Sequence, residues 1–213
     1  IANNRTLRRN PRLEEIINPA TIGLNGFQIK ESTQTTDNYI AMQELEATFV
    51  EADIEITPSF RLMAGVRQEE SIQEVTTFDL FNPTTLVKGD LADDNSYPTA
   101  TATWILEDLG MQLRLGYSKT TSRPDFRELS TAPFIHPVTG LEIIGNPNLT
   151  VAFINNYDAR WEWYFSATES VSVGLFYKEF ETPIEAIMQP GIDNRRTFIN
   201  AESAVLQGIE LDA

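Results

Sequence analysis

Two stretches between residues 111 and 165 alternate strictly between apolar and polar side chains. In Met111–Tyr117 every second residue is apolar, and in Asn156–Phe165 every second residue is apolar and mostly aromatic. This period of two is typical of a β-strand with one apolar and one polar face. The polar face of the second stretch carries charges of both signs. A soluble β-sandwich would bury the aromatic face, whereas a membrane barrel would turn it to lipid and line a wet lumen with the charged face.

The same alternation predicts further strands over residues 60–67, 97–106, 171–177 and 197–211. Beyond Gln68 both faces of the first of these strands become polar, so we expect it to project beyond a bilayer. An extended segment over residues 39–56 changes the phase of its alternation near its middle. We therefore predict a β-bulge near Phe49–Val50, because one extra residue exchanges the two faces of a strand.

The predicted connections alternate between short and long. Short turns are expected at 57–59, 107–110 and 166–170, and long loops at about 72–96, 119–155 and 181–196. Consecutive antiparallel strands place alternate connections at opposite ends of a sheet. All short turns therefore lie at one end and all long loops at the other, as in outer-membrane barrels. A sandwich can show the same asymmetry, so both architectures remain open at this point.

Composition excludes several classes of function. The 213 residues carry a net charge of −15, which argues against nucleic-acid binding because that function needs a basic face. The chain has no cysteine and one histidine, so disulfides are excluded and a zinc site has almost no ligands. No run of about 18 apolar residues predicts a membrane helix. No Gly-rich phosphate loop or nucleophile elbow is present, and we predict neither a cofactor nor enzymatic activity.

Several motifs resemble a known family when they are taken in order. They are Tyr117-Ser118-Lys119-Thr120, Ser122-Arg123-Pro124-Asp125-Phe126, Gly145-Asn146-Pro147-Asn148-Leu149, Asn156-Tyr157-Asp158 and Gly208-Ile209-Glu210. Over roughly residues 39 to 212 this series resembles the C-terminal half of the barrel of a TonB-dependent outer-membrane receptor. The resemblance implies an all-β fold: an antiparallel meander of seven or eight long strands that forms part of a large transmembrane β-barrel.

The resemblance also implies a function. Such receptors bind a scarce nutrient, for example a ferric siderophore, haem, cobalamin or an oligosaccharide, and the TonB complex energises its uptake. The expected partners are therefore outer-membrane lipid, a nutrient ligand and TonB, with no nucleic acid. The expected location is the bacterial outer membrane. Nothing in the sequence selects among the nutrients.

The family motifs are expected to be structural rather than ligand-binding. Proline at position 124 removes a ladder donor and suits the point where a strand leaves the barrel wall. The residues assigned to this structural role are Ser122, Arg123, Pro124, Phe126, Gly145, Asn146, Pro147, Asn156, Asp158, Gly208 and Glu210. The loop residues that are candidates for ligand contact are Arg127, His136 and Asn146.

The chain departs from the complete pattern of the family. No signal peptide, plug domain or terminal aromatic strand is recognisable. We expect a loop-rich lead-in over residues 1–38, with a short helix near 11–18, and barrel strands and loops over residues 39–213. The lead-in carries a basic cluster formed by Arg5, Arg8, Arg9 and Arg12. We therefore predict a piece of a larger protein whose open sheet, when isolated, pairs with another copy through its edges.

The charged residues allow two interpretations. Asp158, Arg160 and Glu162 share one face of a strand. They either line a wet lumen, neutralised across strands by residues such as Arg114 and Lys178, or supply the paired carboxylates of a glycosidase. A second acidic group either forms a solvated loop or loosely holds a cation; it consists of Asp90, Asp93, Asp94 and Asn95.

The aromatic residues near the short turns also allow two interpretations. Trp104, Trp163 and Phe165 form either an aromatic girdle at a membrane interface or the core of a soluble protein. The competing class is therefore a soluble β-sandwich module that binds carbohydrate or protein through its loops. That class requires Trp161 and Trp163 to be buried.

Overall fold

The computed structural model describes residues 16–23, 26–28, 34–189, 191 and 195–213. The chain divides into two compact units, residues 1–34 and 35–213. The described part of the first unit contains a parallel bridge between Ile22 and Phe27. The predicted basic cluster and most of the predicted helix near 11–18 lie outside the described residues.

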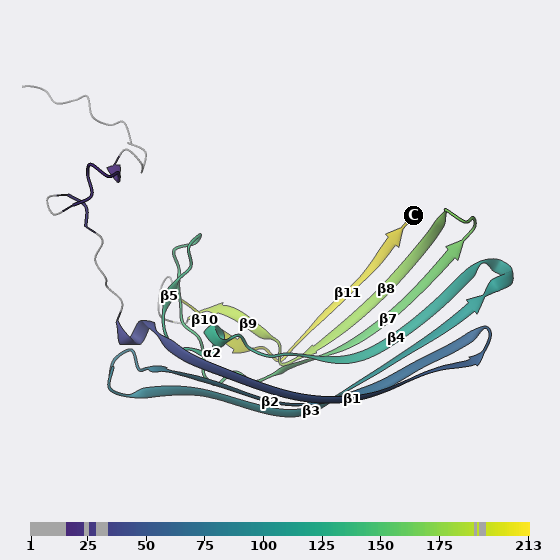
Figure 1. Cartoon of the computed structure of the whole chain (residues 1–213), viewed down its shortest axis with the longest axis horizontal. Helices are drawn as coiled ribbons and strands as arrows, with labels where there is room; N and C mark the ends of the chain where they lie inside the picture. Colours follow the sequence, from purple (N-terminus) through teal and green to yellow (C-terminus); the bar gives the residue numbers. More distant parts are fainter. Residues whose placement is uncertain (1–15, 24–25, 29–33, 190, 192–194) are drawn as a thin grey trace, which may run out of the picture. The chain divides into compact units, whose positions relative to one another are not determined.

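Seven strands of the second unit form one antiparallel sheet in the order β1-β2-β3-β4-β7-β8-β11. Their bounds are β1 Tyr39–Thr57, β2 Phe60–Phe78, β3 Leu86–Leu106, β4 Met111–Ser122, β7 Ala152–Tyr164, β8 Ser170–Glu181 and β11 Ser203–Asp212. The sheet is curved, and β1, β2 and β3 run far past the ends of the other strands (Figure 1). The predicted all-β meander of about seven long strands is confirmed.

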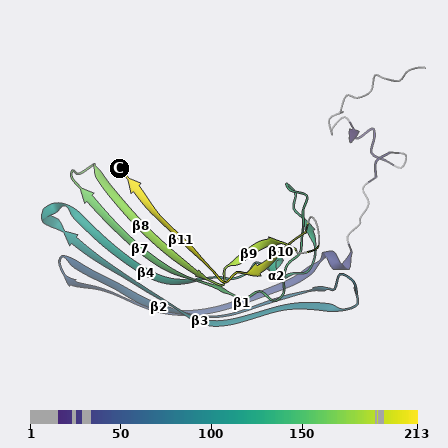
Figure 2. The same cartoon turned by 180° about the vertical axis from the view of Figure 1, so that it is seen from behind.

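Four short strands form a second sheet in the order β5-β6-β10-β9. Their bounds are β5 Phe134–Ile135, β6 Glu142–Ile143, β9 Ile184–Met188 and β10 Arg195–Asn200. The described helical elements are η1 Thr35–Asp37, η2 Glu107–Leu109 and α2 Phe126–Leu129. Strands β9 and β10 and helix α2 lie over the concave side of the main sheet (Figures 1 and 2). No helix in the described parts of the chain is long and apolar enough to cross a membrane.

Cross-strand register gathers apolar side chains on the convex face of the main sheet. One row that crosses all seven strands consists of Ile54, Leu62, Ala102, Leu115, Ala159, Leu175 and Ile209. The rows on either side add Trp104, Trp161 and Tyr157 to the same face. Most of these large side chains are exposed, Ile209 to 69%. We call this uncovered band of rows the apolar belt.

The concave face behind the apolar belt is polar. One of its rows consists of Glu55, Arg61, Thr103, Arg114, Arg160, Gly174 and Glu210. The alternation predicted for Met111–Tyr117 and Asn156–Phe165 therefore divides the faces of β4 and β7 as expected. In this part of the sheet the convex face is apolar and the concave face is polar, which is the arrangement of a membrane barrel wall.

Beyond the apolar belt, the two faces of β1, β2 and β3 exchange their character. On the concave face Val75 of β2 is buried against Leu129 and Leu149 of the following connections. On the convex face Glu46, Glu70 and Asp94 lie directly opposite one another on the three strands and are exposed. Strand β2 continues beyond the apolar belt to Phe78, and its expected projection beyond a bilayer stays a prediction.

The predicted β-bulge near Phe49–Val50 is wrong. Strands β1 and β2 pair without interruption from Tyr39 to Glu55, and the register shifts only between Glu55 and Thr57. The hydrophobic pattern changes phase because the covered side of the sheet changes along the strand. No extra residue is needed, since each side chain keeps its own face while the surroundings of that face differ.

The long connections contain more regular structure than we predicted. Residues 86–96, predicted as loop, form the first half of β3 and pair with β2 in register. Their Asp and Asn residues disfavour strands locally, but the ladder to β2 overrides that weak preference. The connection over residues 119–155 contains α2, β5 and β6, and the one over 181–196 contains β9. The short turn at 107–110 includes η2.

The two outermost strands of the main sheet, in the described residues, are β1 and β11, each paired on one side. Unpaired edges of this kind offer donors and acceptors to another strand. The prediction that an isolated piece self-associates through these edges stays a prediction. The open sheet does agree with the expected part of a larger barrel.

Candidate functional site: the concave wall and its loops

A hollow of about 530 Å³ lies on the concave face behind the apolar belt, mainly over β4, β7 and β8. Arg114, Arg160 and Lys178 contribute positive charge to its lining, and Asp158 and Glu210 contribute negative charge. Charges of both signs in one open depression make it a polar surface suited to water or to a polar occupant.

Glycines create much of the room in this hollow. Gly116 pairs with Asp158, and Gly174 pairs with Arg160, so large polar side chains stand beside empty positions. Gly208 lies opposite Phe176, whose ring covers it so closely that an added Cβ would overlap the ring. The hollow is therefore set by the register of the strands as well as by the charged residues.

The charges of the hollow are partly neutralised, both within a strand and across strands. Arg160 Nε donates to Glu162 Oε1 at 2.9 Å, and its Nη2 donates to Ser172 Oγ at 2.9 Å. Arg114 Nη2 lies 3.9 Å from Glu162 Oε2, which confirms the expected cross-strand pairing of this arginine. Lys178 Nζ donates to the amide oxygen of Asn156 at 3.0 Å rather than to a carboxylate.

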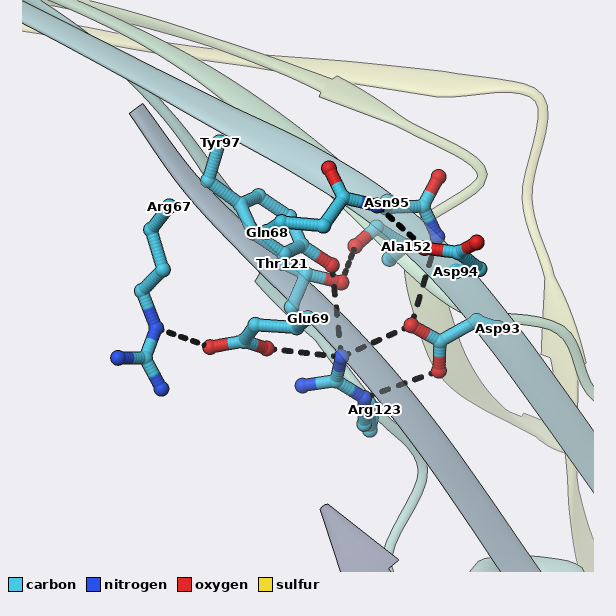
Figure 3. A network of polar contacts seen from close by, with 10 residues as sticks. All are labelled: Arg67, Gln68, Glu69, Asp93, Asp94, Asn95, Tyr97, Thr121, Arg123 and Ala152. Carbon is cyan, nitrogen blue, oxygen red and sulfur yellow. Dashed lines mark hydrogen bonds and ion pairs between the residues drawn. The ribbon is translucent and has the colours of Figure 1, made fainter. Parts of the chain in front are cut away.

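Arg123 ties the connection after β4 to the two long strands beside it (Figure 3). Its Nε and Nη2 donate to the two carboxylate oxygens of Asp93 at 3.0 and 2.8 Å. Nη2 also lies 2.9 Å from Glu69 Oε2 and 3.4 Å from the hydroxyl of Tyr97. The side chains of Arg123 and Asp93 are only 12% and 7% exposed, so water screens this forked ion pair weakly.

The pKa values in this network follow its contacts. Hydrogen bonds to Asp93 raise the pKa of the Arg123 guanidinium well above its ordinary value, although burial opposes the shift. Burial acts to raise the pKa of the Glu69 carboxyl, but hydrogen bonds from Arg67 and Arg123 bring it below its ordinary value. Burial raises the pKa of Tyr97. At neutral pH both Arg123 and Glu69 are therefore charged.

The segment around Gly145 closes onto the end of α2. Gly145 N donates to Ser130 O at 2.9 Å, and Asn146 N donates to Glu128 O at 2.6 Å. A Cβ at position 145 would overlap the carbonyl oxygens of Arg127, Glu128 and Ser130. Only glycine allows this approach of two backbone segments.

Two comparisons bear on the identity of this wall. Residues 5–213 match the family model described as "TonB dependent receptor-like, beta-barrel". The chain belongs to this family. A comparison of the chain with curated protein sequences gave no match.

Solved receptors share the fold of this barrel chain. The hemophore receptor HasR of Serratia marcescens, solved as a double mutant with HasA and heme, has a TM-score of 0.60 and 13% identity; 80% of this chain and 32% of HasR are covered. The ferric-catecholate import receptor Fiu of E. coli K12 has a TM-score of 0.58 and 13% identity, with 88% and 27% covered. The ferric yersiniabactin receptor FyuA of Yersinia pestis has a TM-score of 0.53 and 18% identity, with 81% and 24% covered. This chain thus spans about a quarter to a third of each receptor.

The SRPDF motif of this receptor barrel lies where β4 ends and the chain turns over the concave face. Ser122 is the last residue of β4, Pro124 is fully buried, and Phe126 packs against the small core around Val75. Asp125 caps α2 by accepting from Arg127 N at 2.9 Å. These contacts agree with the structural role that we expected for the motif, and that role stays a prediction.

Each of the three predicted ligand-contact residues of the receptor barrel has contacts of its own within the loops. The Arg127 guanidinium lies 4.9 Å from the centre of the Phe134 ring. His136 Nδ1 accepts from the backbone of Val138 and Thr139 in the turn between β5 and β6. The Asn146 amide donates to Phe198 O at 3.0 Å. Ligand contact by these residues stays a prediction.

The same part of the structure bears on two alternatives from the sequence analysis, namely a soluble β-sandwich and a cation site in an acidic loop. Trp104 and Trp163 are exposed on the apolar belt, whereas a sandwich core would require such residues to be covered. A soluble β-sandwich is therefore not favoured. Asp93, which we grouped with a loose acidic loop, lies in β3 and binds Arg123. Among the described residues no group of three or more potential ligands is arranged to hold a metal ion.

Sequence reasoning missed the partners that fix the loops of this receptor barrel. Asp93 and Glu69, which bind Arg123, lie in segments with no recognisable motif. Asn200, which bonds both Thr150 and Thr182, ends β10; we predicted one strand over residues 197–211, whereas the structure divides this segment into β10 and β11. An available signal was the expected projection of β2 beyond Gln68, because a projecting strand needs a paired neighbour, which residues 86–96 supply.

Proposed function

We propose that this chain forms part of the barrel of an outer-membrane receptor that takes up a scarce nutrient with energy from TonB. Membership of the receptor family supports the proposal, because its members are transporters rather than enzymes. The observation that carries it is the uncovered apolar belt. The strands that form it expose apolar side chains on their convex face and carry polar side chains on their concave face.

The apolar belt fits a bilayer in both size and chemistry. On β4 and β7 it extends over seven residues each, 111–117 and 157–163. With Phe165 the alternating series that begins at Tyr157 reaches nine residues, the lower limit of the roughly 9–11 with which a tilted strand crosses a membrane. Trp104 and Trp163 stand at the end that carries the short turns, where an aromatic girdle lies in such barrels. Outer-membrane lipid is therefore the first partner that we propose.

The nutrient is proposed only as a class. The similar receptors are a hemophore receptor solved with heme, a ferric-catecholate import receptor and a ferric yersiniabactin uptake receptor. Iron complexes are therefore the first ligands to test, ahead of cobalamin and oligosaccharides. The contact with TonB is assigned to parts of the receptor other than its barrel strands.

The test expresses the intact receptor in E. coli cells that lack their own iron receptors. Cells are grown with haemin, ferric enterobactin or ferric yersiniabactin as the sole iron source, in otherwise identical strains with and without TonB. We expect growth on at least one iron complex only when TonB is present, and receptor in the outer-membrane fraction.

Two results would contradict the proposal. Recovery of the receptor as a soluble periplasmic protein would remove the membrane assignment. Correct insertion with TonB-independent growth on every iron source would remove energised uptake. Growth on none of the iron complexes, but TonB-dependent uptake of labelled cobalamin or an oligosaccharide, would move the nutrient class and keep the transporter.

A further inference from the structure

The connection between β4 and β7 and the connection between β8 and β11 lie far apart in sequence but contact each other on the concave side of the sheet. We call residues 123–151 the first loop, and we call the described part of residues 182–202, namely 182–189, 191 and 195–202, the second loop. The concave face of β1, β2 and β3 beyond the apolar belt is the upper wall. We infer that the two loops form one body, and that Arg123 latches this body to the upper wall.

Backbone and side-chain contacts join the two loops at several points. Strand β6 of the first loop pairs in parallel with β10 of the second, and Ile144 N donates to Arg196 O at 3.0 Å. Arg195 Nε donates to Glu142 Oε2 at 2.6 Å. Asn146 reaches Phe198 O, as described above. Non-local parallel pairing of this kind orders both segments at once, because neither can keep its hydrogen bonds alone.

One asparagine closes the base of the body. Asn200 Nδ2 donates to Thr150 O at 3.0 Å and to Thr182 O at 2.8 Å, and its Oδ1 accepts from Thr150 N at 2.8 Å. The side chain thereby bridges the end of the first loop to both ends of the second loop. Separation of the loops would break both bonds to Thr150 together, while the bond to Thr182 lies within the second loop.

The apolar contact between the body and the upper wall is small and shared. Val75 of the wall packs with Leu129 and Leu149 of the first loop, and Ile184 and Phe198 of the second loop border the same cluster. Both loops therefore rest on the same few residues.

The polar part of the contact contains strong ion pairs and also buried polar atoms that have no hydrogen-bond partner. Arg123 grips Asp93 and Glu69 of the wall, and Gln73 Nε2 donates to Pro124 O at 3.1 Å. In contrast, Ser71 Oγ and Gln73 Oε1 of the wall are buried without a hydrogen-bond partner, as is Thr131 Oγ1 of the first loop. Buried polar atoms without partners are costly. A contact that combines such atoms with one strong clamp is suited to release as well as to closure.

The clamp belongs to the first loop alone. In the described residues, the hydrogen bonds found for the second loop run within it or to the first loop and the strands that flank it, whereas Arg123 bonds directly to β2 and β3. Loss of the Arg123 contacts should therefore free the second loop as well, although Arg123 does not touch it. This coupling is the property that separates one latched body from two independent loops.

The test uses spin labels and distance measurements on the intact receptor in outer-membrane vesicles, without any nutrient. The chain has no cysteine, so introduced cysteines in it are labelled selectively. Labels are placed at Phe81, Val138 and Met188 in pairs; Phe81 lies in the turn beyond β2 and Val138 in the first loop, 92% and 87% exposed. Met188 reports on the second loop. The pairs measure first loop to wall, second loop to wall, and loop to loop.

The unaltered receptor should give three narrow distance distributions. Arg123→Gln should broaden both loop-to-wall distributions and raise the detached fraction at least about tenfold, since a poorly solvated ion pair is lost. The loop-to-loop distribution should stay narrow. Arg67→Gln is the matched control, because Arg67 contacts Glu69 at the exposed rim of the same network and should leave all three distributions unchanged.

Several results would overturn the inference. Broadening of the Phe81–Val138 pair alone, or of the Val138–Met188 pair, would show two independent loops. No broadening in Arg123→Gln would remove the latch, and broad loop-to-wall distances in the unaltered receptor would remove the closed state. If Arg123→Gln fails to insert, Arg123→Lys replaces it; this variant keeps the charge but loses the fork, and it must shift both loop-to-wall distributions together. None of these readouts depends on uptake, so the latch can fail while the proposed function stands.

Discussion

The lower and upper parts of β2 use the same alternation of side chains but bury opposite faces. In the lower part, Phe60–Val66, apolar residues point to the convex face, and Val66 is 40% exposed. In the upper part, Ser71–Thr77, the buried residues point to the concave face, and Val75 is 1% exposed. The strand continues between them without a bulge.

This difference shows that the surroundings, and not the strand, decide which face is apolar. The upper concave face is covered by the first and second loops, which exclude water from Val75. The lower convex face has no protein cover in the described residues, and the proposed bilayer fulfils the same physical role there. Exposed carboxylates such as Glu70 and Glu74 stand on the upper convex face, where water solvates them.

The largest effect is expected when a charge enters the covered face of the upper part. Val75→Asp should lower the free energy of unfolding by about 3–5 kcal/mol, because the new carboxylate is buried without a partner. Thr103→Asp on the lower concave face lies opposite Arg61 and Arg114 and should change it by less than about 0.5 kcal/mol. Urea unfolding in lipid vesicles, followed by tryptophan fluorescence, measures both variants. Equal losses would show that the two concave faces are alike.

The next largest effect comes from one substitution made on the convex face of both parts. Leu62→Arg should cost about 2–4 kcal/mol in vesicles, because the residue lies within the apolar belt. Ile72→Arg, on the same face of the same strand, should cost nearly nothing, since Ile72 lies between Glu44 and Ala92 near other carboxylates. The measurement is the urea midpoint of each vesicle-embedded variant. A Leu62→Arg variant as stable as Ile72→Arg would contradict a lipid-facing belt.

A smaller effect is expected from the backbone contact that shapes the cover of the upper part. Gly145→Ala should destabilise the first loop by up to about 3 kcal/mol, because the added methyl group overlaps three carbonyl oxygens that cannot move freely. Gly140→Ala has open space around it and only a positive φ of 68° to tolerate, so about 1 kcal/mol is expected. Hydrogen exchange of residues 142–149 reports both. Faster exchange in Gly140→Ala than in Gly145→Ala would reject this assignment.

The smallest effect is expected at acidic pH, where the first loop should be held less firmly over the upper concave face. The folded-state pKa of Glu69 lies below its ordinary value, so its ion pair stabilises the fold above the ordinary pKa of a glutamate and is lost as pH falls through the lowered one. Arg123 remains charged throughout this window, because its pKa is raised. Hydrogen exchange of the first loop, corrected for intrinsic rates, should therefore quicken at acidic pH while β7 stays protected. Replacement of Glu69 by Gln should remove the pH dependence, and a persistent dependence would point to another group.

The alternation of Met111–Tyr117 and Asn156–Phe165 is enough to predict two strands. It also predicts which side chains share a face and whether that face is apolar or polar. The short turns and the order of the motifs then predict the barrel family. The strand over residues 86–96 escapes prediction because its Asp and Asn residues favour loops locally, whereas its pairing with β2 is a contact between distant segments. The change of phase in β1 suggests a bulge because the sequence does not reveal what covers each face.

The sequence by itself determined the period of the side chains, the places of the short turns and the presence of Arg123, Pro124 and Gly145. Only the tertiary structure decided that the connections fold back over the concave face and that Arg123 meets Asp93, 30 residues away. The physical reason is that periodicity is a local property of the backbone, while burial and ion pairing depend on which distant segment excludes water from a given face.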